Sequence, residues 1–215
     1  ATSALSARGP GAAAEPAAQG CVHIVGDSVV LGARPQLQRT IAGSVVDAEV
    51  GRQGHQAQQV LRQMLADRRL CPNVVLHVGT NGYLHEARYR ELVGALAARG
   101  RVVLVNIRAD RRWTAPNNTL IARTARELPE VRLVDWSAAS DQRTDYFVQD
   151  GIHLTVAGMG VFAEHIRAAL AGTWPAAAPA PLLASAPPAA DPGPHASPAP
   201  AWPAPTQAAP LPSAP

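Results

Sequence analysis

The stretch Cys21-Val-His-Ile-Val-Gly-Asp-Ser-Val-Val-Leu-Gly-Ala33 decides the fold class. Its first half is a short apolar run that ends at Gly26. Its second half begins a pattern with apolar residues three and four apart, which is typical of a helix. Continuous apolar runs of this length suit strands that are covered on both faces. The stretch therefore predicts a buried strand that passes directly into a helix beginning at Ser28.

The same alternation of apolar runs and helical patterns continues to residue 172. The apolar runs are residues 21–25, 44–50, 73–78, 101–107 and 131–135. The helical patterns are residues 28–40, 56–70, 86–99, 118–128 and 155–170, the last with Thr155 as its N-cap. Strict alternation predicts a parallel sheet with helices on both faces, and right-handed crossovers leave few topologies. We expect a three-layer α/β/α sandwich with five parallel strands in flavodoxin-like order, 2-1-3-4-5.

The two ends of the chain differ in composition from this middle region. Residues 1–20 are rich in Ala, Gly, Ser and Pro, and this composition predicts a flexible linker or leader. The segment lacks the charged and apolar regions of an intact signal peptide. Residues 173–215 hold most of the 20 prolines in an Ala-Pro repeat, which predicts a disordered tail. A Pro-rich ligand for a partner is the alternative for the tail. One folded domain is therefore expected at residues 21–172.

Composition excludes several function classes. All 19 basic residues are Arg, and they are scattered against 16 acidic residues, so the net charge of +3 forms no nucleic-acid stripe. The sequence contains no stretch of ~20 apolar residues, so it predicts no membrane span. Neither a GxGxxG nor a Walker motif is present, and HExxH and Cys/His clusters are also missing, so we expect no cofactor and no metal. Nothing indicates an obligate dimer, and a monomer is expected.

Polar residues follow the predicted strands, and ligands bind at the carboxyl ends of strands in such sheets. Ser28 follows the first strand, where the N–H groups of a helix N-terminus can stabilise an oxyanion. A serine hydroxyl needs a base to act as a nucleophile. His153 is the candidate base, Asp150 can hold its other ring nitrogen, and Asn81 can add a donor to the oxyanion hole. Each motif alone is equally typical of a helix cap or a turn. The order of the three motifs along the chain, each at the end of a strand, predicts a catalytic triad.

Gly-Asp-Ser after the first strand, Gly-Thr-Asn after the third and Asp-x-x-His near the end resemble the SGNH (GDSL-type) hydrolase family over residues 21–172. The resemblance implies that Ser28 is the nucleophile and an oxyanion donor, Asn81 is a second donor, and His153 and Asp150 are base and orienter. The family commonly has a Ser-Gly pair after the second strand. This chain has Gly51-Arg-Gln-Gly54 there, so the N–H of Gly51 or Arg52 is expected to donate, with Gly54 as a third choice.

Longer strings carry a more specific resemblance. "GDSVVLGARPQLQ", "VVDAEVGRQGHQA", "LHVGTNG" and "NNTL" resemble the extracytoplasmic catalytic domain of peptidoglycan O-acetyltransferases of the OatA type. This implies acetyl transfer to the C6 hydroxyl of N-acetylmuramic acid, outside the cytoplasm, with acetyl groups supplied by an integral-membrane acyltransferase domain. The loop at residues 109–113 reads Ala-Asp-Arg-Arg-Trp where relatives tend to carry Val-Pro-Arg-Pro-Trp, and this difference is expected to alter acceptor binding.

Three further residues are candidates for substrate binding. Arg108 and Trp113 lie on the loop that follows the fourth predicted strand, and packing of this loop is the alternative to substrate contact. Asp27 is next to Ser28, and it is expected to form hydrogen bonds to loop amides. A triad serves a sugar hydroxyl or water equally well, so a carbohydrate O-acetylesterase remains the alternative to a transferase. A non-catalytic glycan-binding module is a third possibility.

The two cysteines lie at the same, non-catalytic end of the predicted sheet. Cys21 opens the first strand and Cys71 precedes the third, and these strands are neighbours in the expected order. A disulfide is therefore expected, with two unpaired thiols as the alternative. A disulfide indicates an oxidising compartment.

Overall fold

The computed structural model describes residues 20–172. The expectations for a leader at residues 1–20 and a tail at residues 173–215 lie, apart from Gly20, outside these residues. Within them, five parallel strands form one sheet in the order β2-β1-β3-β4-β5. The strands are β1 (Val22–Gly26), β2 (Ser44–Ala48), β3 (Asn73–His77), β4 (Arg101–Val105) and β5 (Val131–Val134). The predicted fold class and strand order are confirmed.

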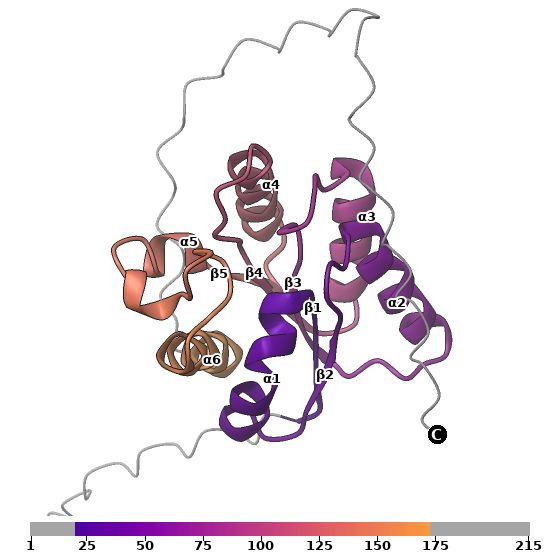
Figure 1. Ribbon diagram of the computed structural model, residues 1–215. Coiled ribbons are helices and arrows are strands. Elements are labelled where there is room, and N and C mark those ends of the chain that lie inside the picture. The colour runs from indigo at the N-terminus through magenta and orange to yellow at the C-terminus, as the bar shows by residue number, and fades with distance from the viewer. Residues whose placement is uncertain (1–19, 173–215) are drawn as a thin grey trace, which may run out of the picture. The chain divides into compact units, whose positions relative to one another are not determined.

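Helices cover both faces of the sheet (Figure 1). They are α1 (Ser28–Thr40), α2 (Gly54–Ala66), α3 (Glu86–Ala97), α4 (Thr114–Glu127), α5 (Trp136–Ala139) and α6 (Val156–Ala171), with a 3-10 turn at Thr144–Tyr146. Side chains of β1, β3, β4 and β5 alternate between two cores, as the pleat of a strand requires. In β1, Ile24 packs into the core shared with α1 and α6, and Val25 packs into the core shared with α2, α3 and α4. The central strands β1, β3 and β4 are thus buried on both faces, as their continuous apolar runs predicted, whereas Val45 of the edge strand β2 is exposed.

The segment between β5 and α6 contains more structure than the sequence predicted. The sequence analysis named no element between residues 135 and 155, and the structure has α5 and the 3-10 turn there. Trp136, at the start of α5, is buried and packs against the rings of Tyr146, Phe147 and Phe162. This aromatic cluster anchors the segment, and α6 then packs beside α1. The start of α6 is thereby placed near the start of α1.

The disulfide between Cys21 and Cys71 is formed, with the two Cα atoms 5.3 Å apart. It joins the chain at the amino ends of β1 and β3, which pair with Val22 opposite Asn73. The neighbouring His23 accepts a hydrogen bond through Nδ1 from the Cys71 amide at 3.0 Å. Burial lowers the pKa of His23, which suits a neutral ring that accepts this bond.

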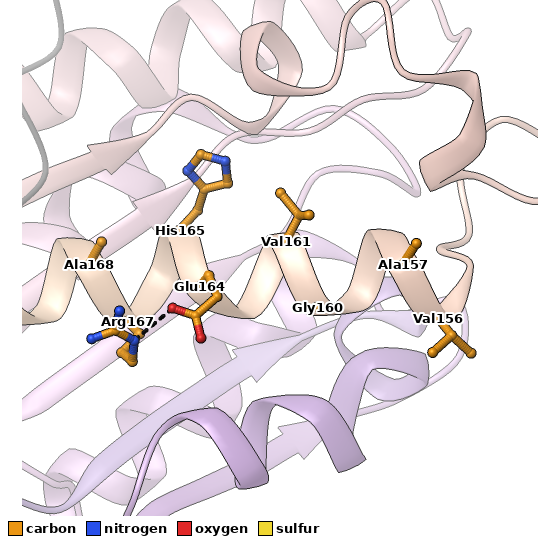
Figure 2. Close-up of a pocket in the computed structure, with 8 residues that line it drawn as sticks. All are labelled: Val156, Ala157, Gly160, Val161, Glu164, His165, Arg167 and Ala168. Carbon is orange, nitrogen blue, oxygen red and sulfur yellow. Dashed lines mark hydrogen bonds and ion pairs between the residues drawn. The ribbon is translucent and has the colours of Figure 1, made fainter.

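The outer face of α6 carries a shallow groove of about 510 Å³ (Figure 2). Its lining includes Val156 and Val161, together with Glu164, which binds Arg167 at 2.8 Å. None of the predicted site residues lines it. None of the helices in residues 20–172 is long and apolar enough to span a membrane.

Candidate active site

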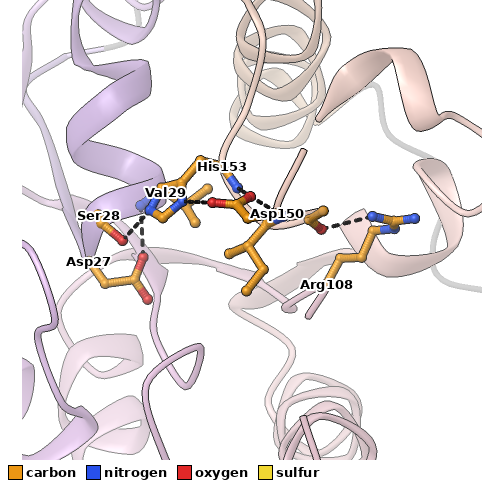
Figure 3. Close-up of polar contacts among 8 residues, drawn as sticks. Asp27, Ser28, Val29, Arg108, Asp150 and His153 are labelled. Atoms are coloured by element: carbon orange, nitrogen blue, oxygen red, sulfur yellow. Dashed lines mark hydrogen bonds and ion pairs between the residues drawn. The ribbon is translucent and has the colours of Figure 1, made fainter. Parts of the chain in front are cut away.

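Ser28, His153 and Asp150 form a hydrogen-bonded chain at the carboxyl edge of the sheet (Figure 3). His153 Nε2 lies 2.9 Å from Ser28 Oγ, and His153 Nδ1 lies 2.6 Å from Asp150 Oδ2. An ionised carboxylate can only accept, so Nδ1 carries the ring proton and Nε2 is left to accept the proton of the serine hydroxyl. This is the geometry in which a histidine can activate a serine nucleophile.

Asp150 is held in place by the turn that it begins. Its Oδ1 accepts hydrogen bonds from the Ile152 and His153 amides at 2.8 and 2.9 Å, while Oδ2 faces the imidazole. Burial would raise the pKa of Asp150, but the bonds from the His153 ring and from the two amides outweigh it and lower this pKa to about 2. Asp150 is therefore ionised at neutral pH and keeps His153 in one tautomer and orientation.

The serine lies at the first turn of α1, and Asp27 caps that turn. The Asp27 side chain is fully buried and accepts a hydrogen bond from the Val29 amide at 3.0 Å. A side chain with no exposed surface cannot touch a substrate, so the expectation of a substrate contact by Asp27 is corrected to a capping role. Ser28 is the first helical residue, and its own N–H has no intrahelical partner.

Three candidate oxyanion donors follow three adjacent strands. Ser28 follows β1, Gly51 follows β2 and Asn81 follows β3, and the order β2-β1-β3 places the other two on either side of the serine. Asn81 donates from Nδ2 to the Arg52 carbonyl at 3.3 Å, which leaves its second amide hydrogen for a ligand. Gly51 has φ of +72°, a left-handed conformation that favours glycine.

The buried Arg52 side chain supports the loop that follows β2 and contains Gly51. Its side chain is 6% exposed, with Nη2 2.6 Å from Asp47 Oδ1 and Nη1 donating to the Asp47 carbonyl at 2.8 Å. Its backbone N–H points to the Glu49 carbonyl at 3.4 Å, whereas the N–H of Gly51 makes no hydrogen bond within residues 20–172. Gly51 is thus the freer donor of the two.

Two asparagines hold the loops of this edge, although the sequence analysis quoted them only within the motif NNTL and gave them no role. Asn117 donates from Nδ2 to the carbonyls of Gly79 and Gly82, and its Oδ1 accepts from the Leu84 amide. Asn118, the next residue of α4, binds both the amide and the carbonyl of Ile107, at 3.0 and 2.8 Å. The sequence did contain a signal for this role, because asparagine disfavours helix interiors and a pair of asparagines is unusual in a helix.

Arg108 and Trp113 contact protein in this structure. Arg108 donates from Nη1 to the Gly151 carbonyl at 2.9 Å (Figure 3). Its guanidinium also lies 4.1 Å from the ring centre of Phe147. Trp113 donates from Nε1 to the Thr80 carbonyl at 3.1 Å. Arg108 thus supports the turn of the triad, and Trp113 supports the loop of Asn81. Among the described residues, no cluster of His, Cys, Asp and Glu is arranged to hold a metal ion.

Comparison with known proteins adds relatives in sequence and in fold. No family model matches the chain. It is 31% identical over 137 residues to the "Putative peptidoglycan O-acetyltransferase YrhL" of Bacillus subtilis, covering 64% of this chain and 22% of that protein. It is 34% identical over 134 residues to the "Peptidoglycan O-acetyltransferase OatA" of Listeria monocytogenes, covering 62% of this chain and 21% of that protein. The chain therefore spans less than a quarter of the length of these relatives.

Solved structures agree with the fold. The C-terminal catalytic domain of peptidoglycan O-acetyltransferase A from Streptococcus pneumoniae superimposes with a TM-score of 0.63 at 22% identity, over 72% of this chain and 94% of that one. A GDSL-like lipase from Bacteroides thetaiotaomicron gives a TM-score of 0.58 at 17% identity, over 73% and 90%. Residues 20–172 thus have the α/β fold of the SGNH (GDSL-type) hydrolases. In sequence, the chain is similar to the named peptidoglycan O-acetyltransferases, as the resemblance of its motifs predicted.

Proposed function

We propose that this chain carries the catalytic domain of a serine-dependent O-acetyltransferase that acts on peptidoglycan. The observation that carries the proposal is the Ser28–His153–Asp150 chain, with contacts of 2.9 and 2.6 Å, in a relative of O-acetyltransferases. The finer assignment, the C6 hydroxyl of N-acetylmuramic acid, comes from the resemblance of the longer motifs. The disulfide supports a location outside the cytoplasm.

The mechanism proposed is acyl transfer in two steps. Ser28 Oγ attacks the carbonyl carbon of an acetyl ester while its proton passes to His153 Nε2. The N–H groups of Ser28 and Gly51 and the amide of Asn81 stabilise the oxyanion. The donor alcohol leaves with the proton from His153, and an acetyl-Ser28 ester remains. A sugar hydroxyl then gives its proton to His153 Nε2 and attacks the carbonyl carbon of that ester. The bond from the acetyl group to Ser28 Oγ breaks, His153 returns the proton to Oγ, and the acetylated sugar leaves.

The exposure of the triad suits a polymeric acceptor. The His153 and Asp150 side chains are 47% and 45% exposed, so the imidazole lies at the surface, where a long glycan strand can reach it. The acetyl donor is proposed to be supplied by an integral-membrane acyltransferase domain, as in the group that the motifs resemble. We expect the described domain to act as a monomer.

Mass spectrometry tests the acyl-enzyme directly. The purified protein is incubated with an activated acetyl ester, with and without a peptidoglycan-derived glycan, beside Ser28→Ala. The expected result is one acetyl group on Ser28 that moves to the glycan, and no adduct on the variant. Ser137→Ala is the matched control, because Ser137 lies away from the triad, at the start of α5, and this variant should acetylate normally. An absence of any adduct would leave only the glycan-binding module.

The same exposure supports an esterase as the second candidate. Water reaches an imidazole that is 47% exposed as readily as a sugar hydroxyl does. Acetyl groups that clear only to acetate, in the presence of saturating glycan, would favour this carbohydrate O-acetylesterase. Transfer that outpaces hydrolysis under the same conditions would favour the transferase.

A further inference from the structure

A polar groove of about 390 Å³ lies between α2 and α3. Five of its lining residues lie on α2 at spacings of three, four, seven and eight, which place them on one helix face. These are His55, Gln58, Gln59, Arg62 and Gln63, and Arg88 of α3 closes the opposite side. Every lining residue is polar or charged, which differs from the apolar lining of most small-molecule pockets.

The groove begins at the same edge of the sheet as the triad. Both helices follow parallel strands, so their first turns lie at the carboxyl edge, and His55 and Arg88 belong to those first turns. The loop just before α2 contains Gly51, and the loop before α3 contains Asn81. The two helix N-termini also favour negative charge near the groove mouth. The first turns of the two helices that line the groove thus lie at the same edge of the sheet as Ser28.

Gln58 is the observation that indicates a ligand. The residue is only 5% exposed and lines the groove, and its side-chain amide makes no hydrogen bond to protein within residues 20–172. The amide therefore has a donor and an acceptor free for a polar group that enters the groove.

Arg88 adds an available cation. Arg62 is already paired with Glu91 at 3.1 Å, whereas no carboxylate in the described part of the chain pairs with Arg88. The groove therefore combines an unsatisfied amide with an unpaired guanidinium, which together match a carboxylate.

We propose that this groove is an acceptor subsite that binds a carboxylate of the glycan strand, with Arg88 as the ion partner and Gln58 as a hydrogen-bond donor. The proposal rests on the proposed function, because peptidoglycan supplies such carboxylates from the lactyl group of N-acetylmuramic acid or from a peptide stem. The subsite would select muramyl acceptors over neutral sugars while leaving the acylation of Ser28 unaffected.

Binding is measured by calorimetry on Ser28→Ala, so that no acetyl group is transferred. Three probes separate the sources: a neutral chito-oligosaccharide, an oligosaccharide with free lactyl carboxylates, and one whose lactyl groups are linked to peptide stems. Arg88→Gln in this background should raise Kd about tenfold for a carboxylate-bearing probe and leave the neutral probe unchanged. Gln58→Leu should give a smaller rise for the same probe.

Arg99→Gln is the matched control, because it removes an equal charge beyond the C-terminal end of α3, at the opposite edge of the sheet. It should leave all three Kd values unchanged. Equal Kd values for Arg88→Gln and its parent with every probe would overturn the subsite, as would an equal loss with the neutral probe. A failure of Ser28 acetylation in the intact protein would refute the proposed function alone, since this binding measurement does not depend on it.

Discussion

Replacement of Asn117 by Leu tests whether the loop of Asn81 must be held for acyl transfer. Asn117 is 2% exposed and binds three backbone groups of that loop, with the Gly79 carbonyl at 3.0 Å and the Gly82 carbonyl and Leu84 amide at 2.9 Å. Gly79 itself has φ of +114°, and a Cβ there would lie 2.9 Å from Asn117 Nδ2. Asn117 and this loop are therefore fitted closely to each other.

The magnitude follows from those three contacts. Leucine fills a similar volume but leaves two carbonyls and one amide unpaired, at about 1–3 kcal/mol for each group that water cannot reach. Because Gly82 is half-buried, water can satisfy part of this, and we expect a total loss of about 3–5 kcal/mol. For a domain of this size, that lowers Tm by roughly 6–20 °C. A displaced Asn81 amide would also slow acylation by up to ~10²-fold, the cost of one oxyanion donor.

The assay is the rate of Ser28 acetylation by an activated ester, at a temperature where the variant is folded by circular dichroism. Thr124→Val is the matched control on the same helix, because Thr124 is also buried and binds only the Leu120 carbonyl at 2.9 Å. It should cost about 1 kcal/mol of stability and leave the acetylation rate unchanged. A folded Asn117→Leu protein that acetylates at the wild-type rate would refute the positioning argument.

Three further predictions concern the triad turn and the disulfide. Arg108→Met should lower kcat about tenfold with little change in KM, because its bond to the Gly151 carbonyl supports the turn, whereas a rise in KM alone would restore a substrate-binding role. Reduction of the Cys21–Cys71 disulfide, which has a sequence separation of 50, should cost about 4 kcal/mol in unfolding experiments and leave kcat at 25 °C unchanged; an unaltered Tm would contradict this. Because the folded pKa of Asp150, about 2, lies below its usual 3.8, this carboxylate stabilises the fold above about pH 4 and loses that contribution as pH falls toward 2. The stability gap between wild type and Asp150→Asn in urea should therefore narrow from pH 7 to pH 2, and a constant gap would count against the assigned cause.

Most of the fold was predictable because local patterns carry it. The apolar run at residues 21–25 and the helical spacing after Ser28 are local properties, and β1 and α1 follow them closely. Helix starts were less accurate: α2 begins at Gly54 and α4 at Thr114, each earlier than the periodicity indicated. Pro116 lies in the first turn of α4, where a missing N–H costs nothing, so its presence gave no reason to delay the helix.

The roles of side chains on the rim depended on partners that are distant in sequence. Arg108 was a substrate candidate because of its place after a strand, yet its partner is Gly151, 43 residues away. Asn117 contacts a loop 35 and 38 residues earlier. No local pattern encodes such contacts, because they form only when the helices pack on the sheet.

The sequence by itself predicted the alternating parallel fold, favoured the disulfide, and selected Ser28, Asp150 and His153 as the candidate catalytic residues. Only the tertiary structure decided that Ser28 and His153 lie 2.9 Å apart across 125 residues. β1 and β5 are separated by two strands in the sheet, and the serine and histidine meet because the Trp136 cluster anchors the intervening segment and α6 packs beside α1. Short-range propensity sets the elements, whereas burial of that aromatic cluster, a property of the whole packed domain, sets the distance on which the chemistry depends.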